Sequence, residues 1–172
     1  MPNWCTNGLT VEGDPDKVQK FREDNTYVEV GEDAGMASGD HRVLPLSFEA
    51  KYPTPRQADG KLIGEGPKVT PGMPDWYQWR IDNWGTKWDL TEETDVEHDG
   101  DYIHYSFDSA WGPPAIWVEK VAAEYPDLKF TIDFEEPGMN FWGVLIFEDG
   151  EMVSEEEGSM DYNEDTGETT RI

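Results

Sequence analysis

The sequence predicts an α+β domain in which an antiparallel sheet carries two helices on one face. Three observations support this prediction. Two segments have the helical spacing of apolar residues, several others alternate apolar and polar residues as strands do, and their order is strand, helix, strand, strand, helix, strand. That order is the split βαβ pattern of ferredoxin-like folds. With 172 residues, the chain has the length of one domain.

The first strand and the first helix are predicted close to the start of the chain. Alternating apolar and polar residues favour a short strand that ends at Gly13. Asp14 and Pro15 then predict a helix start, because aspartate caps a helix N-terminus and proline fits its first position. We expect this helix to run from Pro15 to about Asp24.

A long segment rich in glycine and proline, residues 31–74, comes next. It shows little periodicity, so we interpret it as an insertion into the domain; loops of this length are often functional. Four apolar residues are expected to anchor it to the core: Leu44, Leu46, Phe48 and Tyr52.

The second half of the predicted order begins at Trp76. Alternation predicts strands at residues 76–82 and 102–107, with an acidic turn at residues 92–101 between them. A helix is expected at residues 111–125, where apolar residues recur at i, i+3, i+4 and i+7 before a proline. Further strands are expected at residues 128–134, 142–147 and 151–153.

The last residues are acidic and have almost nothing to bury. We therefore expect one ferredoxin-like domain at residues 1–153 and a solvated acidic tail at residues 154–172.

Charge is the most pronounced property of the composition. The formal net charge is -25, with 38 acidic and 13 basic residues. Residues 1–88 carry 14 acidic and 10 basic residues, whereas residues 89–172 carry 24 and 3. A field of this sign repels DNA and RNA backbones and attracts basic protein surfaces. Solubility or adaptation to a salty cytoplasm is the alternative explanation of the acidity.

Residue types that would indicate an exported protein or a metalloprotein are scarce. The single cysteine, Cys5, excludes an internal disulfide framework and a thiolate zinc site. The three histidines are far apart, and the calcium-loop pattern that starts at Asp161 lacks its glycine and final glutamate. We therefore expect no metal and no cofactor. Without a signal peptide or a membrane-spanning stretch, the expected location is the cytoplasm.

Several short stretches, taken together, resemble the YubB-like family, whose ferredoxin-like domain is encoded on conjugative plasmids and bacteriophages. The resemblance implies the fold and a mobile-element origin, and it carries no reaction. The stretches are Met1-Pro2-Asn3-Trp4-Cys5 with Asn7, Ser47-Phe48-Glu49 with Pro53 and Pro55, Asn83-Trp84-Gly85-Thr86-Lys87-Trp88-Asp89, Phe107 with Ala110-Trp111 and Pro113-Pro114, Tyr125-Pro126, and Glu136, Gly138, Phe141 and Gly143.

Aromatic and basic residues near the middle of the chain form the candidate ligand site. Trp84 and Trp88, with Lys87 between them, could stack a planar ligand and hold its charge, assisted by Trp111 and Arg80. The alternative is that these tryptophans pack in the core and along the sheet edge.

The leading hypothesis is a non-enzymatic accessory protein of a phage or plasmid that counters host defence. It would bind a basic, nucleic-acid-handling host protein through an acidic surface that resembles DNA, without binding nucleic acid or membrane itself. The acidic candidates are Glu92, Glu93, Asp95, Glu155, Glu156 and Glu157. The alternatives are a sponge for a nucleotide signal and an enzyme of unknown reaction.

Overall fold

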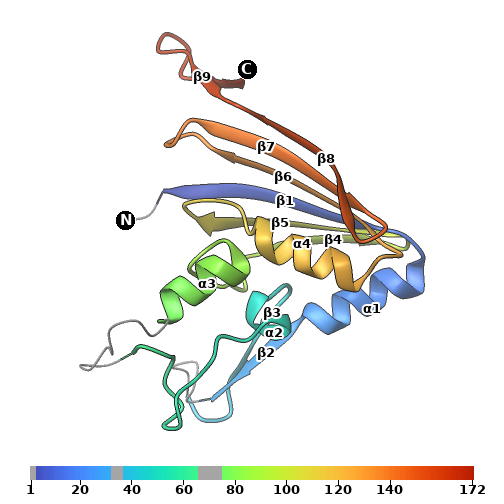
Figure 1. Cartoon of the computed structure of the whole chain (residues 1–172), viewed down its shortest axis with the longest axis vertical. Helices are drawn as coiled ribbons and strands as arrows, with labels where there is room; N and C mark the ends of the chain where they lie inside the picture. Colours follow the sequence, from blue (N-terminus) through green and yellow to red (C-terminus); the bar gives the residue numbers. More distant parts are fainter. Residues whose placement is uncertain (1–2, 32–36, 66–74) are drawn as a thin grey trace.

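A six-stranded antiparallel sheet forms one layer of the protein, in the order β4-β5-β1-β6-β7-β8. The computed structural model describes residues 3–31, 37–65 and 75–172. Two helices, α1 and α4, lie on one face of the sheet (Figure 1). The strands are β1 (Trp4–Glu12), β4 (Asp95–Asp99), β5 (Tyr102–Ala110), β6 (Lys129–Glu136), β7 (Phe141–Glu148) and β8 (Glu151–Gly158), and the two helices are α1 (Pro15–Asn25) and α4 (Ala115–Glu124).

The connectivity confirms the predicted ferredoxin-like α+β fold. β1, α1, β4, β5, α4 and β6 follow one another in the split βαβ order, and β1 lies between β5 and β6 in the sheet. β7 and β8 then extend the sheet beyond β6. No helix in the described part of the chain is long and apolar enough to cross a membrane.

The two faces of the sheet differ in burial. Along β6, residues alternate between buried and half-buried, as expected for a strand with one covered face. Pairs such as Leu9 with Ile132 lie under the helices, whereas pairs such as Thr10 with Thr131 lie on the opposite face. We call this opposite, uncovered side the open face.

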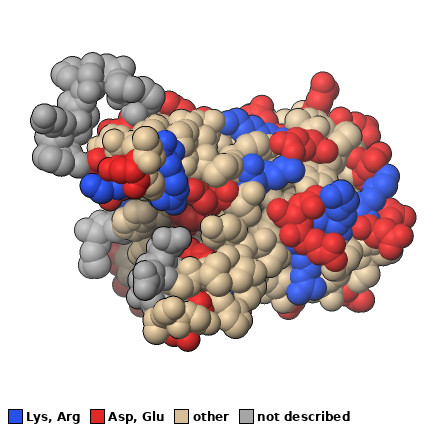
Figure 2. All heavy atoms as spheres, turned by 90° about the horizontal axis from the view of Figure 1, so that it is seen from below, with Lys and Arg blue, Asp and Glu red and all other residues tan. Residues whose placement is uncertain are grey.

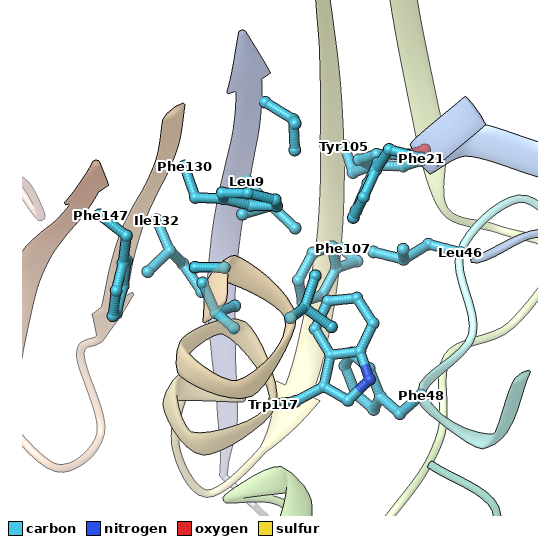
Figure 3. Packing of buried hydrophobic residues seen from close by; sticks show 14 of the residues in the cluster. Leu9, Phe21, Leu46, Phe48, Tyr105, Phe107, Trp117, Phe130, Ile132 and Phe147 are labelled. Atoms are coloured by element: carbon cyan, nitrogen blue, oxygen red, sulfur yellow. The ribbon is translucent and has the colours of Figure 1, made fainter. Parts of the chain in front are cut away.

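Aromatic side chains dominate the core between the sheet and the helices (Figure 3). Phe21 of α1 packs edge-on against Phe130 of β6, with ring centroids 5.4 Å apart. Trp117 of α4 packs against Phe48, with centroids 5.1 Å apart. Large buried rings thus compensate for the low hydrophobic content, because each removes roughly 150–250 Å² from water.

The helix start predicted at Asp14 is confirmed. The Asp14 side chain accepts hydrogen bonds from the backbone N–H groups of Asp16 and Lys17, and Pro15 occupies the first turn of α1. α4 begins after the two prolines of the predicted segment, at Ala115, and buries Trp117 and the apolar stripe that predicted it.

The strand predicted at residues 76–82 is wrong, because these residues form helix α3 (Trp76–Trp84). The Asp75 side chain caps its N-terminus by accepting a hydrogen bond from Gln78 N–H, and Gly85 ends it in the left-handed conformation, at φ 87°. The start signal at Asp75 and the stop signal at Gly85 were both present in the sequence. The apolar residues fit a helical spacing as well as an alternating one.

The acidic turn predicted at residues 92–101 is also corrected. Residues Asp95–Asp99 form β4, which is the second strand of the split pattern. Alternate residues of β4 are carboxylates that lie on the open face of the sheet. Acidic residues are typical of exposed turns, so the sequence pattern did not indicate a strand here.

The expected tail boundary at Ser154 falls inside β8. Residues 154–157 are exposed, as expected, but the pairing with β7 continues through them as far as Gly158. Two more strands, β9 (Met160–Tyr162) and β10 (Thr169–Arg171), form a hairpin. The acidic stretch is therefore paired structure in the described residues.

The insertion at residues 31–74 contains more structure than predicted. Its strand β3 (His41–Leu44) pairs with β2 (Tyr27–Val30), which comes just before the insertion, and helix α2 (Phe48–Lys51) follows. Leu44, Leu46 and Phe48 are buried and Tyr52 packs against the core, which confirms the four predicted anchors. Residues 32–36 and 66–74 of this insertion lie outside the described residues.

Candidate binding site

Two of the motif stretches meet at Asp89, which joins the insertion to the end of the sheet. Its carboxylate accepts hydrogen bonds from the Ser47 hydroxyl at 2.6 Å and from the Phe48 N–H at 2.7 Å. It also accepts from the N–H groups of Glu49 and Leu90. Burial raises the pKa of the Asp89 carboxyl group, and these hydrogen bonds oppose that shift.

A second junction joins α3 to the end of β5 and the start of α4. The Thr86 hydroxyl donates to the Ala110 carbonyl at 3.0 Å. A Cβ atom at Gly85 would lie 3.1 Å from the Pro113 carbonyl oxygen, so only glycine suits this approach and the left-handed backbone. Much of the motif set therefore has a structural role.

Trp84 belongs to the core. It is fully buried, packs against Phe48 at a centroid distance of 5.7 Å, and donates its indole N–H to the Tyr52 carbonyl. A ligand cannot stack on this ring in the folded protein, so the alternative interpretation, packing in the core, applies to Trp84.

Arg80 is also occupied by contacts within the protein. Its guanidinium lies 4.7 Å from the centre of the Trp84 ring and donates to the Thr54 hydroxyl and the Lys87 carbonyl. Glu49 lies 3.7 Å away. Burial lowers the pKa of Arg80. The structure therefore separates Arg80 and Trp84 from the exposed members of the predicted ligand site.

Three tryptophans at this end of the sheet remain accessible. Trp4, Trp88 and Trp111 expose 48%, 38% and 44% of their surface, unlike the buried Trp84. Trp4 and Trp88 pack together with ring centroids 5.7 Å apart, and Lys87 Nζ lies 4.1 Å from the Trp88 ring centre. Trp111 donates its backbone N–H to the Asn3 carbonyl, beside Trp4. Sequence reasoning missed Trp4, although it lies in the first motif stretch.

Trp4 and Trp88 line a cleft of about 630 Å³. One wall is the end of β5 and the other is the loop that leads into β4. Its lining residues are Trp4, Thr6, Trp88, Asp89, Leu90, Thr91, Glu93, Thr94, Asp95, Ser106, Phe107, Asp108, Ser109 and Ala110. We call this feature the tryptophan cleft. Its volume is in the range of ligand sites in proteins.

The cleft exists because β4 is shorter than β5. The last pair between these strands joins Asp95 to Ser106, so residues 107–110 of β5 have no strand beside them on this side. A sheet edge of this kind presents unpaired backbone groups.

Carboxylates surround the cleft, and neither lysine nor arginine is among the described residues that line it. Glu93, Asp95 and Asp108 lie along its walls, and Asp108 accepts a hydrogen bond from the Thr6 hydroxyl at 3.0 Å. Lys87 is the nearby cation, and it rests on Trp88. An aromatic site with this rim favours a cationic ligand over a phosphate.

Residues elsewhere that could take part in catalysis or metal binding make contacts within the fold instead. Cys5 is buried, and burial raises the pKa of its thiol to about 12. His104 shares a hydrogen bond with the Thr10 hydroxyl, and His98 contacts Arg22. Asn163 uses its side chain to cap the turn of the C-terminal hairpin. Among the described residues, no group of His, Cys, Asp and Glu has a metal-binding arrangement.

The six predicted acidic candidates fall into two separate groups. Glu93 and Asp95 line the tryptophan cleft, and Glu92 lies close to them but pairs with Arg42 at 3.4 Å. The run from Glu155 to Glu157 lies on β8, at the opposite edge of the sheet.

Charge is segregated between the two layers of the fold. The six strands of the sheet contain thirteen acidic residues and one basic residue, Lys129. The four helices contain seven acidic and six basic residues. Seen from the side of the insertion and the helices, lysine and arginine intermix with aspartate and glutamate (Figure 2). Part of the asymmetry along the sequence is therefore an asymmetry between layers.

Most acidic residues of the sheet form no ion pair with the residues that the structure describes. Lys129 pairs with Glu148 at 3.3 Å, and Arg171 of β10 pairs with Asp133 and Glu135. The other ten acidic residues of the six strands make no ion pair among the described residues. On β4, Asp95, Glu97 and Asp99 form a row on the open face, with neighbours roughly 6.8 Å apart along the strand.

The fold and the site define the class of protein: a ferredoxin-like domain with an extended sheet and an acidic open face. A family model described as "Ferredoxin-like domain in Api92-like protein" matches residues 83–172, just over half of the chain. The chain therefore belongs to the Api92-like family.

Two relatives agree with this assignment. The chain is 28% identical over 109 residues to "Uncharacterized protein YubB" of Escherichia coli (strain K12), covering 63% of this chain and 75% of YubB. This similarity confirms the resemblance drawn from the motif stretches. The crystal structure of protein api92 from Yersinia pseudotuberculosis matches with a TM-score of 0.60 at 10% identity, covering 91% of this chain and 98% of api92. That match is a likeness of fold.

Proposed function

We propose that the protein is a binding protein whose acidic open face occupies a basic surface on a nucleic-acid-handling protein of the host. The observation that carries the proposal is the segregation of charge, with thirteen acidic residues and one basic residue in the sheet against near neutrality in the helices. Three of the thirteen, Glu136, Glu155 and Glu157, lie on the helix-covered side, and the other ten lie on the open face. Acidity that served solubility alone would not need this separation. A concentrated field of one sign steers an oppositely charged partner and speeds its association.

The mobile-element origin implied by the YubB-like resemblance suggests the kind of partner. A nucleic-acid-binding defence factor presents lysine and arginine where phosphates bind. Carboxylates in rows on a rigid sheet can stand where those phosphates would lie. In this proposal the protein acts by occupying the nucleic-acid-binding surface of its partner, and it needs neither a reaction nor a cofactor.

The experiment compares two triple variants that remove the same amount of charge. Asp95→Asn, Glu97→Gln and Asp99→Asn neutralise the β4 row on the open face. Asp16→Asn, Glu23→Gln and Asp82→Asn neutralise exposed residues of α1 and α3 and serve as the control. Each variant and the wild-type protein is used to capture proteins from an Escherichia coli lysate.

The proposal expects the wild-type protein and the control variant to retain the same basic, nucleic-acid-handling protein. The open-face variant should lose it, added duplex DNA should compete for it, and retention should fall as salt rises, because salt screens exposed charges. Equal capture by both triple variants, or capture that DNA does not affect, would contradict the proposal.

A further inference from the structure

The backbone of β5 at the tryptophan cleft has hydrogen-bonding groups with no strand beside them. The Trp111 N–H donates to the Asn3 carbonyl at 2.9 Å, in line with the pairing of Trp4 with Ala110. Hydrogen-bonded and non-bonded pairs alternate in an antiparallel ladder. The odd-numbered residues of β5 therefore bond to β1, and the even-numbered residues point their backbone groups away from it.

Beyond the end of β4, the even-numbered residues are Asp108 and Ala110. Both line the cleft. The Ala110 carbonyl already accepts a hydrogen bond from the Thr86 hydroxyl. The N–H and carbonyl of Asp108 and the N–H of Ala110 remain. In the described part of the chain, the pairing with β4 ends at Ser106, and no turn or loop backbone group bonds to these three groups.

We propose that an extended, basic segment of a protein partner adds to β5 in the tryptophan cleft as a short antiparallel strand. Strand addition supplies main-chain hydrogen bonds at an exposed sheet edge, while side chains at alternate positions provide specificity. This inference deepens the proposed function, because it rests on a basic protein partner and specifies how part of it is bound.

The register specifies which side chains the segment carries. Residues directly opposite each other in an antiparallel pair share a face of the sheet. The residue opposite Asp108 therefore lies on the open face beside that carboxylate, and the residue opposite Ala110 lies beside Trp4. The residue between them points to the other face, near Leu90 and Phe107. The preferred pattern is basic, apolar, basic.

Arginine suits the two basic positions. Its guanidinium bonds carboxylates with two parallel N–H groups and stacks on tryptophan faces. A phosphate-bearing ligand is disfavoured by Glu93, Asp95 and Asp108 on the cleft walls. The negative field of the open face would guide the segment to the cleft before its backbone pairs.

The test uses a dye-labelled peptide with the central sequence Gly-Arg-Val-Arg-Gly and two isomers that differ only in the position of one N-methyl group. Methylation of the arginine amide opposite Asp108 removes a donor that points at β5. Methylation of the valine amide removes a donor that points away. Both isomers keep the charge, composition and side chains of the parent peptide. Binding is measured by fluorescence polarisation at constant salt.

The parent peptide is expected to bind, the valine isomer to bind within about twofold of it, and the arginine isomer to bind at least about tenfold more weakly. Trp88→Ala should weaken binding of the parent peptide, whereas Tyr77→Ala, at an exposed aromatic residue of α3 that does not line the cleft, should leave it within about twofold. Circular dichroism establishes that both variants fold.

Equal affinity of the two isomers would overturn strand addition, and so would an absence of binding. The proposed function would survive either result, because capture of a basic protein by the open face does not depend on β5 pairing. If the β4-row variant loses both the peptide and the captured protein while the isomers differ, both proposals are supported.

Discussion

The carboxylate of Asp89 accepts a hydrogen bond from the hydroxyl of Ser47 at 2.6 Å, across 42 residues of sequence. Ser47 is the N-cap of α2 in the insertion, and Asp89 begins the loop that forms one wall of the tryptophan cleft. Through this contact the insertion holds that wall in place.

Replacing Asp89 should therefore destabilise the fold and loosen the cleft. Asp89→Ala removes the acceptor of four hydrogen bonds and leaves buried donors unpaired, which is expected to cost roughly 2–4 kcal/mol. Urea unfolding measures the loss. Asp82→Asn, at an exposed position of α3, is the control and should stay within about 0.5 kcal/mol of wild type. A wild-type unfolding midpoint for Asp89→Ala would show that the junction does not stabilise the protein.

The tryptophans of the motif stretches should respond differently to substitution. Trp84→Ala empties a fully buried site and should cost about 3–5 kcal/mol of unfolding free energy. Trp88→Ala removes a partly exposed ring, so it should lower the unfolding free energy much less and should instead weaken binding in the tryptophan cleft. Thermal and urea unfolding of both variants would test this division, and a larger loss for Trp88→Ala would refute it.

The pKa of the Cys5 thiol predicts that the folded protein resists thiol reagents. Because burial raises this pKa to about 12, the reactive thiolate is scarce near neutral pH. A chromogenic disulfide reagent at about pH 8 should label Cys5 slowly in the native state and quickly in urea. Rapid labelling without denaturant would mean that the start of β1 opens readily.

A pH dependence is expected at Glu124. Burial raises the pKa of its carboxyl group, but hydrogen bonds from Lys51 and Tyr52 outweigh burial and lower the pKa overall. A depressed pKa stabilises the fold above the ordinary value of 4.5, and this contribution is lost as pH falls through the folded-state pKa.

Glu124→Gln should therefore be less stable than wild type near neutral pH, by at most about 1 kcal/mol because the group is partly exposed. The difference should shrink below about pH 4. Urea unfolding across pH tests this, with Glu119→Gln on the same helix as the control. If the stability difference between wild type and Glu124→Gln instead grew toward acid pH, the pKa of Glu124 would be raised in the folded state, and the prediction would be wrong.

Gly158 tests the docking of the C-terminal hairpin. A Cβ atom there would lie 2.6 Å from the indole nitrogen of Trp142 and would collide with the Ile172 backbone oxygen. Gly158→Ala should displace the hairpin and release Arg171 from Asp133. Faster amide exchange confined to residues 159–172 would confirm this; unchanged exchange would show that the hairpin tolerates the methyl group.

The sequence allowed the order of the ferredoxin-like core to be predicted because its main elements have clear periodicity and caps. The Asp14 cap before α1 and the alternation along β6 are examples. α3 was misassigned because alternation outweighed the cap at Asp75 and the stop at Gly85. β4 and the end of β8 were missed because strands rich in acidic residues resemble solvated turns and tails.

The candidate site was less predictable for a geometric reason. Trp88 was identified, but its partner Trp4 is 84 residues away in sequence, and only the pairing of β1 with β5 brings that region to the cleft. The cleft itself depends on the difference in length between β4 and β5. The sequence pattern of a single segment contains no information about the relative lengths of two strands.

The glutamates of β8 also bear on how copies of this protein meet. If two molecules approached with their β8 strands side by side, the glutamates at four of the eight positions would bring like charges close together, which opposes sheet-to-sheet growth and fibre formation. Crowded together, the molecules should repel one another at that border and stay dispersed. The tryptophan cleft at the end of β5 is bordered by acidic residues too, so the same repulsion opposes pairing between two copies of the protein there.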